Sequence, residues 1–122
     1  MKAVLMQSGR LWQQDLPMPE PQRGEVLVRT CACGICGTDL HAVKHTEALI
    51  KTSREVGGGF KLTTDQPVVL GHEFCAEIID YGPGTTKTYV TGQLVCSMPV
   101  LLRAETVGLG YSDQAPGGFS EY

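Results

Sequence analysis

The chain has 122 residues, close to the commonest size of a single domain and enough to bury one modest core. Hydrophobic residues make up 42% and charged residues 19%, which is ordinary for a soluble globular protein. The net charge of −3 and the scattered lysines and arginines argue against a nucleic-acid partner. No apolar stretch approaches the roughly 20 residues that span a bilayer, and residues 1–7 are too short and polar-ended for a signal peptide. We therefore expect a cytoplasmic protein with no membrane partner.

Glycine and proline divide the chain into short β-like segments. The expected strands, in chain order, are residues 2–6, 25–30, 73–81 and 93–98. Residues 16–21 contain three prolines and can form neither a helix nor a central strand, because proline has no N–H to donate. Many short strands with regular turn signals predict a small barrel or sandwich.

One short helix and one long loop are expected between the second and third of these strands. Thr38 and Asp39 can both accept from free N–H groups at a helix start, so they predict a short helix that ends near Lys44. Residues 45–66 contain three consecutive glycines at 57–59 and are expected to form a long surface loop.

The cysteine count is odd, and no secretory signal accompanies it, so free thiols or metal ligands are expected rather than a disulfide framework. The five cysteines are Cys31, Cys33, Cys36, Cys75 and Cys96. The spacing of Cys33 and Cys36 admits a redox pair, a zinc knuckle, or one ligand beside one small buried residue. We favour the third interpretation, because neither a βαβ pattern nor a second pair of ligands accompanies the two cysteines.

A thiolate, an imidazole and a carboxylate are the side chains that suit a catalytic zinc site with one open position. Cys36 and His72 both lie beside glycines, where the chain can turn a side chain inward. Asp39 could accept the second ring N–H of a ligating histidine and so fix its tautomer. Taken singly, each residue also has an ordinary explanation: a core cysteine, a turn histidine, and in Glu73 a surface charge.

Two longer motifs resemble those of the zinc-dependent medium-chain alcohol dehydrogenases. They are GICGTDLH at residues 34–41 and PVVLGHE at residues 67–73. Further family-like marks are MKA at 1–3, GEVLVR at 24–29 and PGGFSEY at 116–122. The resemblance implies a mainly β fold with short helices, a GroES-like β-barrel that is incomplete relative to the family's full catalytic domain. Residues 1–122 would then be one domain, the N-terminal portion of that catalytic domain.

The resemblance also implies a metal site. Cys36 and His72 match two catalytic zinc ligands, and Glu73 matches the carboxylate that can approach the metal during ligand exchange. Asp39 matches the residue that holds the ligating histidine. The family's remaining ligand position lies beyond Tyr122, so the site is expected to bind zinc weakly or with a rearranged set of ligands. Only Cys96 falls in the region where many members carry four structural cysteines, so no structural zinc is expected.

The same resemblance implies a proton path and a cofactor. Thr38 matches the hydroxyl that takes the proton of the substrate alcohol, and His41 matches a possible next carrier toward solvent. The glycines at 57–59 and 108–110 do not continue as G-x-G-x-x-G, so no Rossmann domain is expected within the chain and both glycine groups are expected to be flexible loops. NAD or NADP would bind only if another chain supplies that domain.

The functional prediction is the zinc-binding portion of an alcohol or polyol dehydrogenase, which oxidises a small-molecule alcohol to a carbonyl and is inactive alone. The alternative is a standalone GroES-like binding or assembly module without dehydrogenase activity. A co-chaperonin role is a weaker third possibility, because it rests on analogy of fold alone. Because segments that follow Tyr122 in the family complete its barrel, we also expect exposed apolar surface and a homo-oligomer that covers it.

Overall fold

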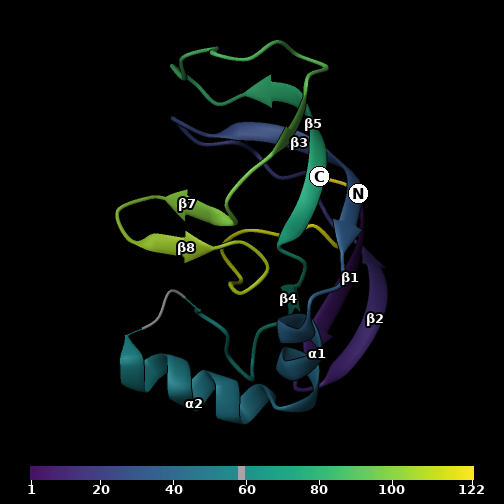
Figure 1. Ribbon diagram of the computed structural model, residues 1–122, viewed down its shortest axis with the longest axis vertical. Helices are drawn as coiled ribbons and strands as arrows, with labels where there is room; N and C mark the ends of the chain where they lie inside the picture. Colours follow the sequence, from purple (N-terminus) through teal and green to yellow (C-terminus); the bar gives the residue numbers. More distant parts are fainter. Residues whose placement is uncertain (58–59) are drawn as a thin grey trace.

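The computed structural model describes residues 1–57 and 60–122, and its first sheet forms around the N-terminal strand (Figure 1). β1 (Lys2–Gln7) pairs antiparallel with β2 (Arg10–Asp15) on one side and with β4 (Val68–Val69) on the other. The hairpin turns at Ser8 and Gly9, whose φ angles of 47° and 80° are typical of a type I′ turn. The first predicted strand is confirmed, whereas β2 was not predicted.

A second sheet has the strand order β3-β5-β6. Its strands are β3 (Val26–Gly34), β5 (Glu73–Tyr81) and β6 (Leu94–Cys96), and all of them pair antiparallel. The prediction for residues 73–81 is confirmed to the residue. The strand predicted at 25–30 extends further, to Gly34, and the one predicted at 93–98 is shorter at both ends.

A separate hairpin of β7 (Val100–Leu102) and β8 (Thr106–Gly108) was not predicted. Gly108 ends β8, so it belongs to a strand rather than to a flexible loop. Gly110 then lies in a tight turn and is buried, because its backbone packs against Gly71. The expectation of a flexible loop at 108–110 is therefore wrong.

Two helices lie together at one end of the molecule (Figure 1). α1 (Gly37–Lys44) confirms the predicted short helix. α2 (Thr46–Val56) shows that the predicted loop over 45–66 is wrong for half of its length. This helix buries Thr46, Ile50 and Ser53, which recur at helical spacing, and it ends at Gly57 in the left-handed conformation. Of the three glycines that suggested a loop, 58 and 59 lie outside the described residues.

The C-terminal segment 116–122 ties the two larger sheets together. Val4 N–H donates to Phe119 O, and Thr30 N–H donates to Glu121 O, so the segment bridges β1 and β3. Figure 1 shows the two ends of the chain side by side on the same flank. The fold therefore brings the far end of the sequence back to β1 and to the turn that follows β4.

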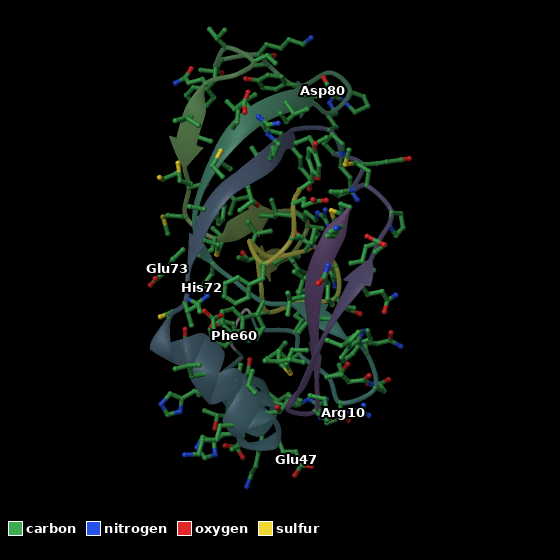
Figure 2. All side chains as sticks on the ribbon, turned by 90° about the vertical axis from the view of Figure 1, so that its right-hand side faces the viewer. Arg10, Glu47, Phe60, His72, Glu73 and Asp80 are labelled. Carbon is green, nitrogen blue, oxygen red and sulfur yellow. The ribbon has the colours of Figure 1, made fainter. Side chains whose placement is uncertain are left out.

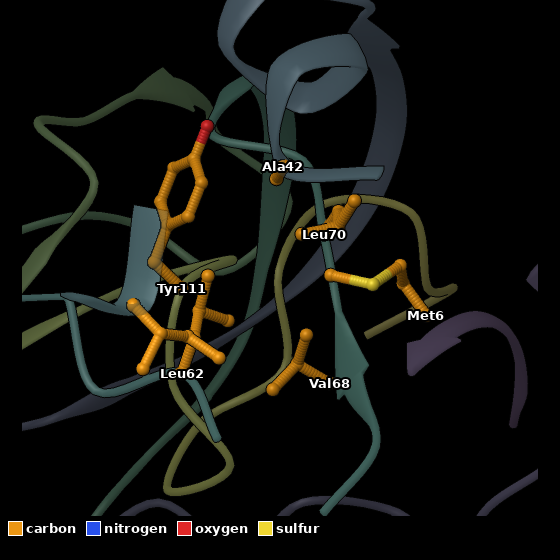
Figure 3. Packing of buried hydrophobic residues seen from close by; sticks show 7 residues of the cluster. Met6, Ala42, Leu62, Val68, Leu70 and Tyr111 are labelled. Carbon is orange, nitrogen blue, oxygen red and sulfur yellow. The ribbon is translucent and has the colours of Figure 1, made fainter. Parts of the chain in front are cut away.

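The main core lies where the helices meet β1, β4 and the loop after β8. Its buried members, of which all but Ile50 are labelled in Figure 3, are Met6, Ala42, Ile50, Leu62, Val68, Leu70 and Tyr111. The expectation of a mainly β domain with short helices is confirmed. Neither helix of the described residues is long and apolar enough to cross a membrane.

Candidate metal centre

Three potential ligands meet where α1 begins and β5 begins. Cys36 precedes the first turn of α1, and His72 and Glu73 lie at the start of β5. One ligand atom from each residue lies within 4.8 Å of the other two. Figure 2 shows His72 and Glu73 next to each other at the end of the helical part. The structure therefore brings together the three residues that the sequence singled out as metal ligands.

The position of His72 depends on the tight turn before it. Gly71 has a φ of 95°, and a Cβ added there would lie 2.8 Å from Phe119 N and 3.0 Å from Cys33 Sγ. On the other side, Leu70 O accepts from Phe119 N–H and Gly71 O accepts from Gly118 N–H. Glycine is required here for both its conformation and its lack of a side chain. The C-terminal segment thus holds the turn that directs His72 toward α1.

Cys33 takes part in this packing and not in the group of ligands. A Cβ added at Gly118 would lie 2.7 Å from Cys33 Sγ, so the thiol fills the space that two glycines leave open. Burial raises the pKa of the Cys33 thiol, which keeps it protonated and less suited to bind a metal. Cys33 is half-buried, so the prediction of a small buried residue holds only in part, and the thiol packs beside the candidate ligand Cys36.

Asp39 connects the start of α1 to His72. Its carboxylate is 2% exposed, and Oδ2 accepts from Cys36 N–H at 2.9 Å. The other oxygen, Oδ1, lies 3.3 Å from His72 Nδ1, but neither atom has a hydrogen-bond partner with acceptable geometry. A buried polar pair without partners costs free energy. A metal at His72 Nε2 would place the ring proton on Nδ1, and a small ring rotation would then let it donate to Asp39.

Thr38 contacts His72 and belongs to a short polar chain of side chains with Tyr111. Its Oγ1 is 3.2 Å from His72 Nε2 and accepts from the Tyr111 hydroxyl at 2.8 Å. Tyr111 is 4% exposed, and its ring packs on those of His72 and Phe60 at centroid distances of 5.1 and 4.4 Å. Desolvation raises the pKa of Tyr111 to about 12, with the hydrogen bond to Thr38 as a smaller opposing effect. The phenol is therefore a permanent donor at neutral pH.

The structure does not bring His41 into contact with the hydrogen-bonded side chains of Thr38 and Tyr111. His41 is exposed on α1, and its ring lies 5.7 Å from that of His45, further from the ligands. Its role as a proton carrier stays a prediction. Tyr111, in contrast, was missed by the sequence analysis. It lies in a glycine-rich segment with no pattern of its own, and only the fold shows that it contacts Thr38.

The donor set fits a zinc ion. Thiolate sulfur, imidazole nitrogen and carboxylate oxygen are the ligands that zinc prefers, and three protein ligands are typical of a catalytic site. The surroundings also favour a cation, because Cys36, Asp39 and Glu73 are all acidic groups. Among the described residues, none of them forms an ion pair with a lysine or arginine. His72, with Nδ1 unpaired and facing Asp39, is oriented as a metal-binding histidine would be.

Comparison with known proteins finds a matching family model and relatives of this chain. Residues 22–122 match the family model described as the alcohol dehydrogenase GroES-like domain. The chain is 33% identical over 125 residues to L-threonine 3-dehydrogenase of Sinorhizobium medicae, covering 92% of this chain and 33% of the relative. It is 34% identical over 138 residues to the protein of the same name from Streptomyces avermitilis, covering all of this chain and 36% of the relative. The chain thus spans about a third of the length of these curated relatives.

Solved structures resemble the chain over nearly its whole length. A putative zinc-binding dehydrogenase from Sinorhizobium meliloti, bound to NADP, superposes with a TM-score of 0.74 at 28% identity, covering 99% of this chain and 34% of that one. The 2R,3R-butanediol dehydrogenase of Bacillus subtilis gives a TM-score of 0.71 at 26% identity, covering 98% of this chain and 36% of that one. The described fold is therefore the fold of one region within larger dehydrogenases.

Proposed function

The chain belongs to the GroES-like domain of the zinc-dependent medium-chain alcohol dehydrogenase family, and on that premise we propose that it forms the metal-binding part of an alcohol dehydrogenase. The reaction is oxidation of a small-molecule alcohol to a carbonyl, with the hydride passing to NAD or NADP. A nicotinamide-binding region outside these 122 residues would complete the enzyme. The named strands of the described residues pair antiparallel, which supports assigning the dinucleotide to that other region. We further propose that residues 1–122 act as one domain.

The observation that carries this proposal is the convergence of Cys36, His72 and Glu73 within 4.8 Å. Cys36 and His72 would be the protein ligands of one zinc ion, and Glu73 would be a third, exchangeable ligand. Asp39 would hold the His72 ring by accepting from Nδ1–H. Zinc bound in this position supplies a Lewis acid that favours loss of the proton from an alcohol.

Thr38 would take that proton. In the structure its hydroxyl hydrogen can point to His72 Nε2, 3.2 Å away, while its oxygen accepts from Tyr111. Once Nε2 serves as a ligand, it no longer accepts, and the Thr38 hydroxyl is free to exchange protons with a substrate oxygen. Because Thr38 is exposed, solvent can receive the proton next, directly or through His41.

The first test is the zinc content of the protein purified without chelators or a histidine tag. We expect about one zinc per chain, lost in Cys36→Ala and in His72→Ala and kept in the matched control Cys96→Ser. Asp39→Asn should bind zinc roughly 10–100-fold more weakly while keeping all three ligands. A folded protein that binds neither zinc nor cobalt would overturn the proposal, and the GroES-like binding or assembly module would then be the better description.

We also propose a homo-oligomer. Large apolar side chains are exposed on the segment that contains β6 and β7, namely Val90 at 74%, Leu94 at 62%, Met98 at 75% and Leu102 at 87%. Large apolar side chains that are exposed in this way favour association. A second copy of the chain would cover it, and sedimentation at increasing concentration should show a dimer or larger species. A monomer at all concentrations would contradict this.

A further inference from the structure

Three thiols lie side by side across the β3-β5-β6 sheet, on the face away from the core. Ala76 and Ile78 of β5 are buried, so Cys75, which alternates with them, points to the opposite face. On β6 its partner in the register is Cys96. On β3 the register shifts between Thr30, opposite Ala76, and Ala32, opposite Cys75, which leaves Cys31 as the unpaired extra residue beside Cys75.

The three thiols do not form a second metal cluster. Among the residues that the structure describes, only Cys36, His72 and Glu73 come close enough together to hold an ion. Cys31 Sγ instead approaches the carbonyl oxygen of Arg29 at 3.7 Å. A two-thiol reaction, and not a three-thiol site, is the chemistry that this row of cysteines can perform.

The hydrogen bonds of the ladder show that Cys75 and Cys96 are suitably placed for a disulfide. Ile78 N–H donates to Gln93 O at 3.0 Å and Ile78 O accepts from Gly92 N–H at 2.8 Å, so Gly92 and Gln93 form a bulge opposite Ile78, which occupies a hydrogen-bonded position of the ladder. Bonded and non-bonded pairs alternate along an antiparallel ladder, so Cys75 and Cys96, three steps further, form a non-bonded pair. The Cα atoms of such pairs lie roughly 4.5 Å apart, within the range of roughly 4.4–6.8 Å that a disulfide spans.

We propose that Cys75 and Cys96 are a redox-active pair that reacts with low-molecular-weight disulfides to form a cross-strand disulfide. The exposed Cys96 thiolate attacks one sulfur of oxidised glutathione, which releases one glutathione thiol and leaves a mixed disulfide on Cys96. The Cys75 thiolate then attacks Cys96 Sγ and releases the second glutathione. The two cysteines lose two electrons and two protons, and oxidised glutathione gains them to become two thiols.

The disulfide would lie at the edge of the candidate metal centre without using any of its ligands. Cys75 and Cys96 line the same shallow hollow as His72 and Glu73, and Glu73 is two residues before Cys75 on the same face of β5. The inference does not depend on the proposed dehydrogenase, because it needs only the register of β5 and β6. Either proposal can therefore fail while the other stands.

The experiment is to treat the reduced protein with oxidised glutathione, block remaining thiols with N-ethylmaleimide and digest with trypsin under non-reducing conditions. Cys75 lies in the tryptic peptide 62–87, Cys96 in 88–103, and the other three cysteines in 30–44. We expect peptide 62–87 linked to 88–103, a fall in free thiols from five to three, and a protein lighter by two hydrogens.

Variants keep the test decisive. Cys96→Ser should abolish the linked peptide, Cys31→Ser should leave it unchanged, and Cys75→Ser should retain glutathione on Cys96. All three positions lie on the outer face of the sheet, and circular dichroism checks that each variant folds. A link from Cys75 to Cys31, or glutathione that stays on Cys96 in the unmodified protein, would overturn the proposal.

Discussion

Methionine and leucine side chains are buried at the helical end of the molecule and exposed in the segment 89–102. At the helical end Met6 and Leu70 are 1% and 2% exposed, whereas in the other segment Met98 and Leu102 are 75% and 87% exposed. The buried pair belongs to a core built from β1, β4 and both helices. Met98 lies just before β7 and Leu102 is its last residue, and the only partner of β7 among the described strands is β8.

The helical end is therefore the well-packed part of the fold. Cys36, His72 and Glu73 all lie beside the well-packed end, and segments distant in sequence hold the turn that carries His72. The exposed segment contributes no residue to that group. A metal site needs ligands held in fixed positions, and the residues of the proposed site lie where packing fixes the backbone.

The largest expected effect comes from removing matched leucines at the two ends. Leu70→Ala should lower the free energy of unfolding by about 2–5 kcal/mol, because it leaves a cavity in the main core. Leu102→Ala should change it by no more than about 0.5 kcal/mol, because the side chain is already in water. Urea unfolding of both variants, at a protein concentration where neither associates, measures the difference. Equal losses would show that segment 89–102 is buried in solution.

A smaller effect is expected from matched glycines. Gly71 and Gly92 both have positive φ angles, of 95° and 88°, so alanine is strained at either position. A Cβ at Gly71 would meet Phe119 N at 2.8 Å, whereas a Cβ at Gly92 would meet only Glu77 Oε1 at 3.7 Å. We expect Gly92→Ala to cost about 1 kcal/mol, and Gly71→Ala to cost about 1–3 kcal/mol more.

Zinc affinity at the proposed metal site is a second measurement that distinguishes the Gly71 and Gly92 variants. Gly71→Ala should also weaken zinc binding, because it moves the turn that positions His72, while Gly92→Ala should leave zinc affinity unchanged. Calorimetric zinc titration of the two folded variants measures this. If both variants bind zinc equally well, the turn at Gly71 does not position the ligand.

The sequence predicted the elements whose pattern is local. The strand at 73–81 is an apolar-rich segment that ends before a Gly-Pro-Gly turn. The short helix α1 was predicted, but its N-cap is Cys36 and not the predicted Thr38 or Asp39; Asp39, in the first turn, accepts from Cys36 N–H. β2 was missed because Arg10–Asp15 is an almost fully exposed edge strand without alternation. α2 was missed because the glycines after it outweighed helical spacing in a polar segment.

The candidate site divides along the same line. Cys36, Asp39, His72 and Glu73 could be named because two short motifs resemble those of the dehydrogenase family. Tyr111 could not be named, because its contact with Thr38 joins residues 73 positions apart and depends on how the loop after β8 folds over α1. Long-range partners of this kind leave no periodic pattern in a single sequence.

The smallest effect, and the one that sharpens the role of Tyr111, is expected from Tyr111→Phe. At neutral pH the loss of its hydrogen bond to Thr38 should cost about 0.5–1.5 kcal/mol of stability.

The pKa of Tyr111 is raised from 10 to about 12 in the folded state. A raised pKa means that this contribution to stability is fully present below pH 10 and is lost as the pH rises toward 12. The free energy of unfolding of the unsubstituted protein should therefore fall over that pH window by up to about 1.4 kcal/mol per pH unit. The Tyr111→Phe variant should not show this part of the pH dependence. Urea titrations of both proteins at pH 8, 10 and 11 measure it, and parallel pH profiles would show that the phenol is already solvated in the folded state.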